Sequence, residues 1–350
     1  MQYAFNTCFP GPKSVKIHIN SECNYNCVYC YSDRSSTVLS TSDWIDFINS
    51  MKSFGIHTVE ISGGEPFLHK DLLKIMQRCY DLGQNITVYT NASLITSEDM
   101  VKLRNFRDRL IISVKYGCSG VYENLTRNTA KITKIEDTMK ALAEEGVATV
   151  SFITVTKNII PRLKDAINRS IELGAFPVVE RYVPVKSIAL NKCLMIDSRD
   201  WALALSYIKQ VYSHFATIID GVSRIQGGVC SCYTSQFSVL QDGSVVPCQF
   251  LPVSQSIGNI KKVSVNQLVG IFNEKQKSWK QLPQDCTGCS VRTTCGGGCR
   301  TYSFYTDNAS GRDPLCSGDC PSTLGHCAFT VIHYLQSKGS VNNKGLRKIP

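Results

Sequence analysis

The chain has 350 residues, which allows one large domain or one domain with a smaller module. Hydrophobic residues make up 43% of it, but no apolar run approaches the roughly 20 residues that cross a bilayer, so we expect no membrane span. The formal net charge of +10 raises nucleic acid as a partner, but no basic segment interleaved with aromatic residues is present, so nucleic acid is disfavoured.

The chain contains seventeen cysteines. Residues 1–20 carry no apolar signal segment, so these cysteines indicate metal or redox chemistry in a cytoplasmic protein rather than disulfides in a secreted one. Ten of them lie from Cys230 to Cys327, which predicts a second metal-bearing module in the C-terminal part.

Six predicted strands alternate with helices through the first half of the chain. The strands are expected at 15–19, 57–62, 86–90, 110–114, 148–155 and 176–183. The intervening helices are expected at 42–54, 72–82, 97–106, 132–145 and 161–173, and one more amphipathic helix at 199–215. Such alternation is typical of a parallel sheet, because crossover connections carry helices between parallel neighbours. The pattern does not decide whether the sheet closes.

The first strand leads into Cys23, Cys27 and Cys30, at the spacing C-x3-C-x2-C. A cubane iron–sulfur cluster is normally held by four thiolates, so three thiolates would leave one iron open to a small ligand. The alternatives are a zinc site or a buried stripe on a helix, since the cysteines recur at i, i+4 and i+7. The poor helix formers at 24–26 favour the cluster.

Gly63-Gly64-Glu65 follows the second strand, at the sheet edge where sites form in parallel sheets. The glycines would let backbone approach a ligand closely, and Glu65 could accept a hydrogen bond from an ammonium group. Taken alone, this triplet is equally typical of a simple turn.

The cysteine spacing, the preceding strand and the segment Ser62-Gly63-Gly64-Glu65-Pro66 together resemble radical S-adenosylmethionine (radical SAM) enzymes. The resemblance implies an α/β fold, an open (β/α)6 partial TIM-like barrel. It implies a [4Fe-4S] cluster on the three cysteines whose open iron binds S-adenosyl-L-methionine. The implied chemistry is reductive cleavage to a 5′-deoxyadenosyl radical, with electrons from a flavodoxin- or ferredoxin-type donor. The implied cofactor-binding residues are Gly63, Gly64, Glu65, Asn91, Ser113 and Arg127.

The C-terminal cysteines follow the series C-x10-G-x4-C…C-x2-C-x5-C-x3-C…C. By residue type alone they also suit a zinc ribbon. The whole series resembles the SPASM extension of radical SAM enzymes, which implies two auxiliary clusters. The implied ligands of the first are Cys230, Cys232, Cys248 and Cys299. Those of the second are Cys286, Cys289, Cys295 and Cys316, with Cys320 or Cys327 as alternatives to Cys316.

The predicted organisation is a barrel over 1–197, a bridging helix and linker over 198–224, a SPASM domain over 225–330 and a tail over 331–350. SPASM relatives mostly modify peptides, so the resemblance favours cross-linking, oxidation or epimerisation of a ribosomally made peptide. Dehydrogenation or epimerisation of a small molecule, such as a sugar or aminocyclitol, is the alternative, and an iron–sulfur or zinc scaffold is the non-enzyme alternative.

The residue after Cys248 bears on the reaction. Sulfatase-maturating relatives carry an aspartate base there, whereas this chain has Gln249, and a neutral amide cannot take a proton as a carboxylate can. That activity is therefore disfavoured, and no catalytic acid or base is assigned. Because the first strand begins near residue 15, we expect no leader-binding domain, so a peptide would bind the barrel directly or be delivered by a separate protein.

Overall fold

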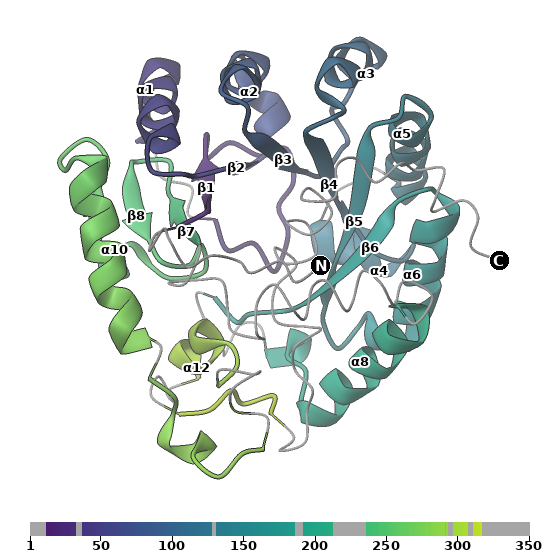
Figure 1. Cartoon of the computed structure of the whole chain (residues 1–350). Coiled ribbons are helices and arrows are strands. Elements are labelled where there is room, and N and C mark those ends of the chain that lie inside the picture. Colours follow the sequence, from purple (N-terminus) through teal and green to yellow (C-terminus); the bar gives the residue numbers. More distant parts are fainter. Residues whose placement is uncertain are drawn as a thin grey trace, which may run out of the picture.

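The computed structural model describes residues 12–32, 37–127, 131–185, 192–212, 236–279, 281–290, 292, 297–306 and 311–316 (Figure 1). Three of the predicted cluster ligands, Cys230, Cys232 and Cys295, lie outside these residues, as do Cys320 and Cys327. None of the described helices is long and apolar enough to cross a membrane.

The described strands form one sheet in the order β6-β5-β4-β3-β2-β1-β7-β8-β9. Neighbours from β6 through β1 to β7 run parallel, whereas β8 and β9 add in antiparallel fashion. The strands are β1 (Ser14–His18), β2 (Thr58–Ser62), β3 (Asn85–Thr90), β4 (Leu110–Tyr116), β5 (Ala148–Val155), β6 (Phe176–Arg181), β7 (Gln236–Val239), β8 (Ser244–Val246) and β9 (Gly258–Asn259).

Helices cover the outer face of this curved sheet (Figure 1). Those between the parallel strands are α1 (Thr41–Lys52), α2 (Leu72–Asp81), α3 (Ser97–Leu103), α4 (Val121–Thr126), α5 (Ile132–Glu144) and α6 (Leu163–Glu172). The later helices are α8 (Ser198–Tyr212), α10 (Val265–Trp279) and α12 (Arg300–Tyr305). Short 3-10 turns, such as those at Pro66–Leu68 and Ile160–Arg162, connect several elements.

The local sequence accounts for where the helices begin and which face they bury. Ser40 caps α1 by accepting a hydrogen bond from the Asp43 backbone, and the Asp43 side chain accepts one from the Ser40 backbone in return, which is a capping box. Along α1, apolar side chains three and four residues apart pack on the sheet: Trp44, Phe47, Ile48 and Met51.

These elements confirm the predicted fold class, an open parallel barrel. All six predicted strands are present and ordered consecutively from β1 to β6. The predicted helix at 199–215 is α8; it packs beside α6, and Trp201, Leu205 and Ile208 join the barrel's core.

Strands β7, β8 and β9 were not predicted. β7 pairs in parallel with β1, from Ser14 opposite Gln236 to Ile17 opposite Val239, so the C-terminal part of the chain extends the barrel sheet directly. Phe237 of β7 and Phe272 of α10 belong to the same buried cluster as the barrel strands. The described C-terminal segments and the barrel therefore share one hydrophobic core.

Candidate active site

One cavity lies at the carboxyl ends of the parallel strands. It is lined by the cysteine loop after β1, the Gly63-Gly64 turn after β2, residues at or near the ends of β3 to β6, and Gln249-Phe250 from the C-terminal part. Because sites in parallel sheets form at this edge, the cavity is the candidate active site.

The structure brings Cys23, Cys27 and Cys30 to this cavity together. Their loop is held by backbone hydrogen bonds to α4: the Val28 N–H donates to the Leu125 carbonyl (2.9 Å), and the Asn26 N–H donates to the Thr126 carbonyl (3.3 Å). The segment is a loop and not a helix, so the alternative of a buried helical stripe is wrong.

The positions of the three thiols bear on which metal centre they could hold. Among the described residues, no three His, Cys, Asp or Glu side chains are gathered as ligands of one ion. In a cluster each thiolate binds a different iron, so wider spacing is expected. Burial raises the pKa of the Cys27 thiol to about 12, and a bound metal would keep this thiol deprotonated at neutral pH.

The two glycines also allow a close backbone contact that the sequence did not indicate. A Cβ on Gly64 would lie 1.9 Å from the Glu22 carbonyl oxygen, and one on Gly63 would lie 2.5 Å from the Asn20 carbonyl oxygen. The turn is also bonded to this segment, because the Glu65 N–H donates to the Glu22 carbonyl (2.7 Å). The glycines therefore admit the backbone that leads into the cysteine loop, although both still line the cavity.

The Glu65 carboxylate is occupied by the protein itself. It accepts hydrogen bonds from the Asn91 N–H (2.8 Å), the Thr90 hydroxyl (2.7 Å) and the Phe67 N–H (3.1 Å). Burial raises the pKa of Glu65 to about 6, although these three donors oppose the rise. Its evident structural role is to fix the end of β3 against the turn after β2.

Asn91 and Ser113, both predicted to bind the cofactor, line the cavity. Asn91 donates from its side-chain amide to Asn24 of the cysteine loop (2.9 Å), which ties that loop to β3. The Ser113 hydroxyl is buried and makes no hydrogen bond to a described residue, so it is available to a ligand. Arg127 instead lies exposed at the end of α4 and does not line the cavity.

Charged side chains fill the interior of the barrel. Lys16 and Glu60 form a buried ion pair (3.5 Å), and Glu60 also accepts hydrogen bonds from Tyr89 (3.1 Å) and Gln236 (2.9 Å). Lys115 lies over the Tyr29 ring of the cysteine loop, 4.3 Å from its centroid.

Polar side chains on β4, β5 and β6 continue this set of interior groups. Lys115 donates to the Thr154 hydroxyl, and Thr154 is opposite Glu180 in the β5–β6 register. Burial lowers the pKa of Lys115 to about 8. The sequence patterns indicated none of these interior charges as site residues, because alternating polar residues in a strand are equally typical of a solvated face.

Five of the predicted auxiliary ligands are described: Cys248, Cys286, Cys289, Cys299 and Cys316. Cys248 is buried two residues after the end of β8. The helix that begins after Cys299, α12, packs against the segment after Cys248, and the Tyr305 hydroxyl donates to the Phe250 carbonyl (2.7 Å). Cys286 and Cys289 share one tight turn, with the Cys289 N–H donating to the Cys286 carbonyl (3.1 Å).

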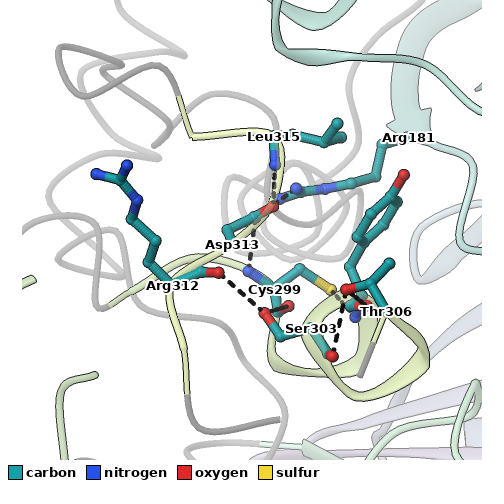
Figure 2. Close-up of polar contacts among 8 residues, drawn as sticks. Arg181, Cys299, Ser303, Thr306, Arg312, Asp313 and Leu315 are labelled. Carbon is teal, nitrogen blue, oxygen red and sulfur yellow. Dashed lines mark hydrogen bonds and ion pairs between the residues drawn. The ribbon is translucent and has the colours of Figure 1, made fainter. Parts of the chain in front are cut away.

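Asp313 connects two of these cysteine segments to the barrel (Figure 2). Its carboxylate forms a buried ion pair with Arg181 of β6 and accepts hydrogen bonds from the backbone N–H groups of Cys299 and Leu315, both at 2.9 Å. The Cys316 N–H donates to the Asp313 carbonyl, also at 2.9 Å. The sequence contained no signal for Asp313, because Arg181 is 132 residues away.

The class of protein follows from comparison with known families. The family model described as "Radical SAM superfamily" matches residues 17–167, which span β1 to α6 and include the cysteine loop and the Gly-Gly-Glu turn. The chain therefore contains a radical SAM domain, and the resemblance to radical SAM enzymes is confirmed.

Particular relatives extend over most of the chain. The "PqqA peptide cyclase" of Bradyrhizobium diazoefficiens is 26% identical and covers 88% of this chain and 87% of its own. The "AdoMet-dependent heme synthase" of Methanosarcina barkeri is 22% identical, and the match covers 87% of this chain and 96% of that protein. A solved structure titled "Native anSMEcpe with bound AdoMet and Kp18Cys peptide" superposes with a TM-score of 0.74 at 19% identity, covering 97% of this chain and 100% of that one. The last similarity shows the fold.

Proposed function

We propose that this protein is a radical SAM enzyme that modifies a peptide. The observation that carries the proposal is the single cavity that gathers the cysteine loop, the Gly63-Gly64 turn and Gln249-Phe250 from the C-terminal part. A cofactor held at the cysteine loop and the Gly63-Gly64 turn would face a substrate that also contacts Gln249 and Phe250. The peptide cyclase relative supports a peptide as that substrate.

The proposed cofactor site consists of the three loop thiolates and the polar groups beside them. Cys23, Cys27 and Cys30 would hold a [4Fe-4S] cluster, and Ser113 and Asn91 would contact S-adenosyl-L-methionine. Once bound, this pair supplies a 5′-deoxyadenosyl radical that removes a hydrogen atom from the substrate. The chain's own part is to position the substrate and to shield the radical, and the Tyr29 ring lines the cavity where it could contribute to that shielding. The proposed role of Arg127 in this site stays a prediction.

The C-terminal part is proposed to hold two auxiliary clusters in a SPASM domain over 225–330. Cys248 and Cys299 would serve the first, and Cys286, Cys289 and Cys316 the second, each completed by cysteines outside the described residues. The packing of α12 against the segment after Cys248 supports the first pair. A flavodoxin- or ferredoxin-type donor and a separate peptide-delivery protein are further proposals.

Co-expression tests the proposed substrate class. The chain would be expressed anaerobically with each short peptide encoded beside its gene, and the peptides would be analysed by mass spectrometry. A cross-link or desaturation removes two hydrogen atoms, and an epimerisation is detected by deuterium uptake from heavy water. A mass change that requires Cys23 supports the proposal, whereas unmodified peptides beside continued 5′-deoxyadenosine formation would contradict it.

A small-molecule substrate is the second candidate. The similarity to the heme synthase over 96% of that relative's length favours it. It predicts that purified protein consumes S-adenosylmethionine faster in a cell extract depleted of peptides, whereas the peptide proposal predicts no such stimulation.

A further inference from the structure

Glu180 is a carboxylate in the candidate active site that makes no hydrogen bond or close ion pair with a described residue. It is the second-last residue of β6, is 7% exposed and lines the cavity. No hydrogen bond or ion pair joins its carboxylate to a described residue, whereas buried polar groups are normally paired. A buried carboxylate that faces a cavity and is not hydrogen-bonded within the described part of the chain is suited to act on a ligand.

The other carboxylates near this cavity are already occupied. Glu65 accepts three hydrogen bonds from the protein, and Glu60 is bonded to Lys16, Tyr89 and Gln236. Asp313 is paired with Arg181 and holds two backbone groups. Among the described residues that line the cavity, Glu180 is the carboxylate left for substrate.

The charges around Glu180 come from four strands. Lys16 of β1, Lys115 of β4 and the adjacent Arg181 of β6 favour its charged form, and Glu60 of β2 opposes it. Burial is the largest influence and raises the pKa of Glu180 to about 6. At neutral pH the group is therefore mostly ionised, yet more basic than an exposed carboxylate, which suits proton transfer.

Gln249, which occupies the position where sulfatase-maturating relatives carry an aspartate base, cannot act as a base. Gln249 lines the same cavity, and its side-chain oxygen is buried with no hydrogen bond to a described residue. This amide oxygen can accept a hydrogen bond from substrate but cannot take its proton.

We propose that Glu180 is the general base that takes a proton from the substrate; this inference rests on the proposed function. After a hydrogen atom has been removed from a substrate carbon, that carbon bonds to a nitrogen, oxygen or sulfur atom of the substrate, whose bond to hydrogen breaks. The proton passes to a Glu180 oxygen. The remaining electron passes to a one-electron acceptor of the iron–sulfur class. The substrate loses two hydrogen atoms overall.

The test uses the full chain co-expressed with a peptide encoded beside its gene, in wild type, Glu180→Gln and Glu180→Asp. We expect Glu180→Gln to form 5′-deoxyadenosine within about threefold of wild type while the modified peptide falls at least about 10²-fold, as is typical for a missing base. Glu180→Asp, which retains a carboxylate, should form at least about tenfold more modified peptide than Glu180→Gln. Glu172→Gln, an exposed carboxylate on α6, is the matched control and should match wild type.

The pH dependence of the melting temperature provides a second test that does not require turnover. A carboxylate with a raised pKa binds protons more tightly in the folded state, so stability is lost as pH rises from about 4.5 to about 6. The melting temperature of wild type should fall relative to Glu180→Gln over that interval, and parallel curves would overturn the proposal.

The activity measurements distinguish a failure of the Glu180 assignment from a failure of the proposed function. Modified peptide within threefold of wild type in Glu180→Gln, or loss of 5′-deoxyadenosine together with product, would overturn the assignment of Glu180 alone. A wild-type chain that forms 5′-deoxyadenosine but modifies no peptide would overturn the proposed function, and this inference with it.

Discussion

At the scale of single residues, Gly64 occupies a position where the structure shows a need for glycine that the sequence did not indicate. The sequence indicated that glycine was needed for a ligand, because the triplet follows a strand end. The structure shows that the Glu22 carbonyl occupies the space where a Cβ would lie. A close approach between two loops 42 residues apart cannot be derived from residue spacing, whereas the family motif could still be recognised.

Replacement of Gly64 by alanine should therefore destabilise the protein even without a cofactor. A Cβ 1.9 Å from a backbone oxygen forces the loop to move, and overpacking typically costs about 1–3 kcal/mol. We expect the free energy of unfolding of the iron-free protein, measured in urea, to fall by about 3 kcal/mol.

Gly270→Ala in α10 is the matched control for that change. A Cβ there meets nothing within 4 Å, and alanine is favoured over glycine in a helix by about 1 kcal/mol, so this variant should be equally or more stable. Equal stability of the two variants would contradict the close approach at Gly64.

Gln249 is the second residue whose role is testable. Its buried oxygen has no described partner, which suits one ordinary hydrogen bond to substrate, worth about 1 kcal/mol. Gln249→Ala should therefore slow turnover of the true substrate by roughly tenfold or less, since about 1.4 kcal/mol corresponds to one decade. A loss of about 10²–10⁴-fold, or conversion of a sulfatase Cys or Ser peptide to formylglycine, would instead indicate acid–base chemistry at this position.

At the scale of elements, the strands that alternate with helices were predictable and the later strands were not. The strands β1 to β6 carry apolar residues in alternation or in short runs, and each is followed by a helix, so local periodicity identified them. β7 has four residues, and its stability comes from pairing with β1, more than 200 residues earlier. Neither its length nor its composition distinguishes it from an extended loop.

The end of β6 carries the Arg181–Asp313 pair, which joins the barrel to the cysteine segments (Figure 2). Both side chains are at most 5% exposed, and removal of one partner from a buried pair leaves an uncompensated charge at a cost of about 3–5 kcal/mol. Asp313→Asn should lower the free energy of unfolding by that amount.

The exposed pair of Lys102 and Glu98 on α3 supplies the control for Asp313→Asn. Surface pairs contribute about 0–1 kcal/mol, so Glu98→Gln should change the unfolding free energy by about 0.5 kcal/mol or less. If Asp313→Asn costs no more than this, the buried pair does not hold the two parts together.

At the scale of the whole molecule, the barrel and the described C-terminal segments share one hydrophobic core, and both line the candidate active-site cavity. The predicted cysteine sets require anaerobically purified protein to be brown and to hold about twelve irons, four for each of three cubanes. A content near about eight would mean one auxiliary site is empty or holds a smaller cluster. Colourless protein with zinc would support the ribbon alternative.

The formation of 5′-deoxyadenosine tests the central claim most directly. Reduced wild-type protein given S-adenosylmethionine should form it, as should the control Cys193→Ala, which removes an exposed cysteine outside the cavity. The triple variant Cys23→Ala, Cys27→Ala, Cys30→Ala should form none while retaining about eight of about twelve irons. Formation of 5′-deoxyadenosine by the triple variant at the wild-type rate would contradict the account.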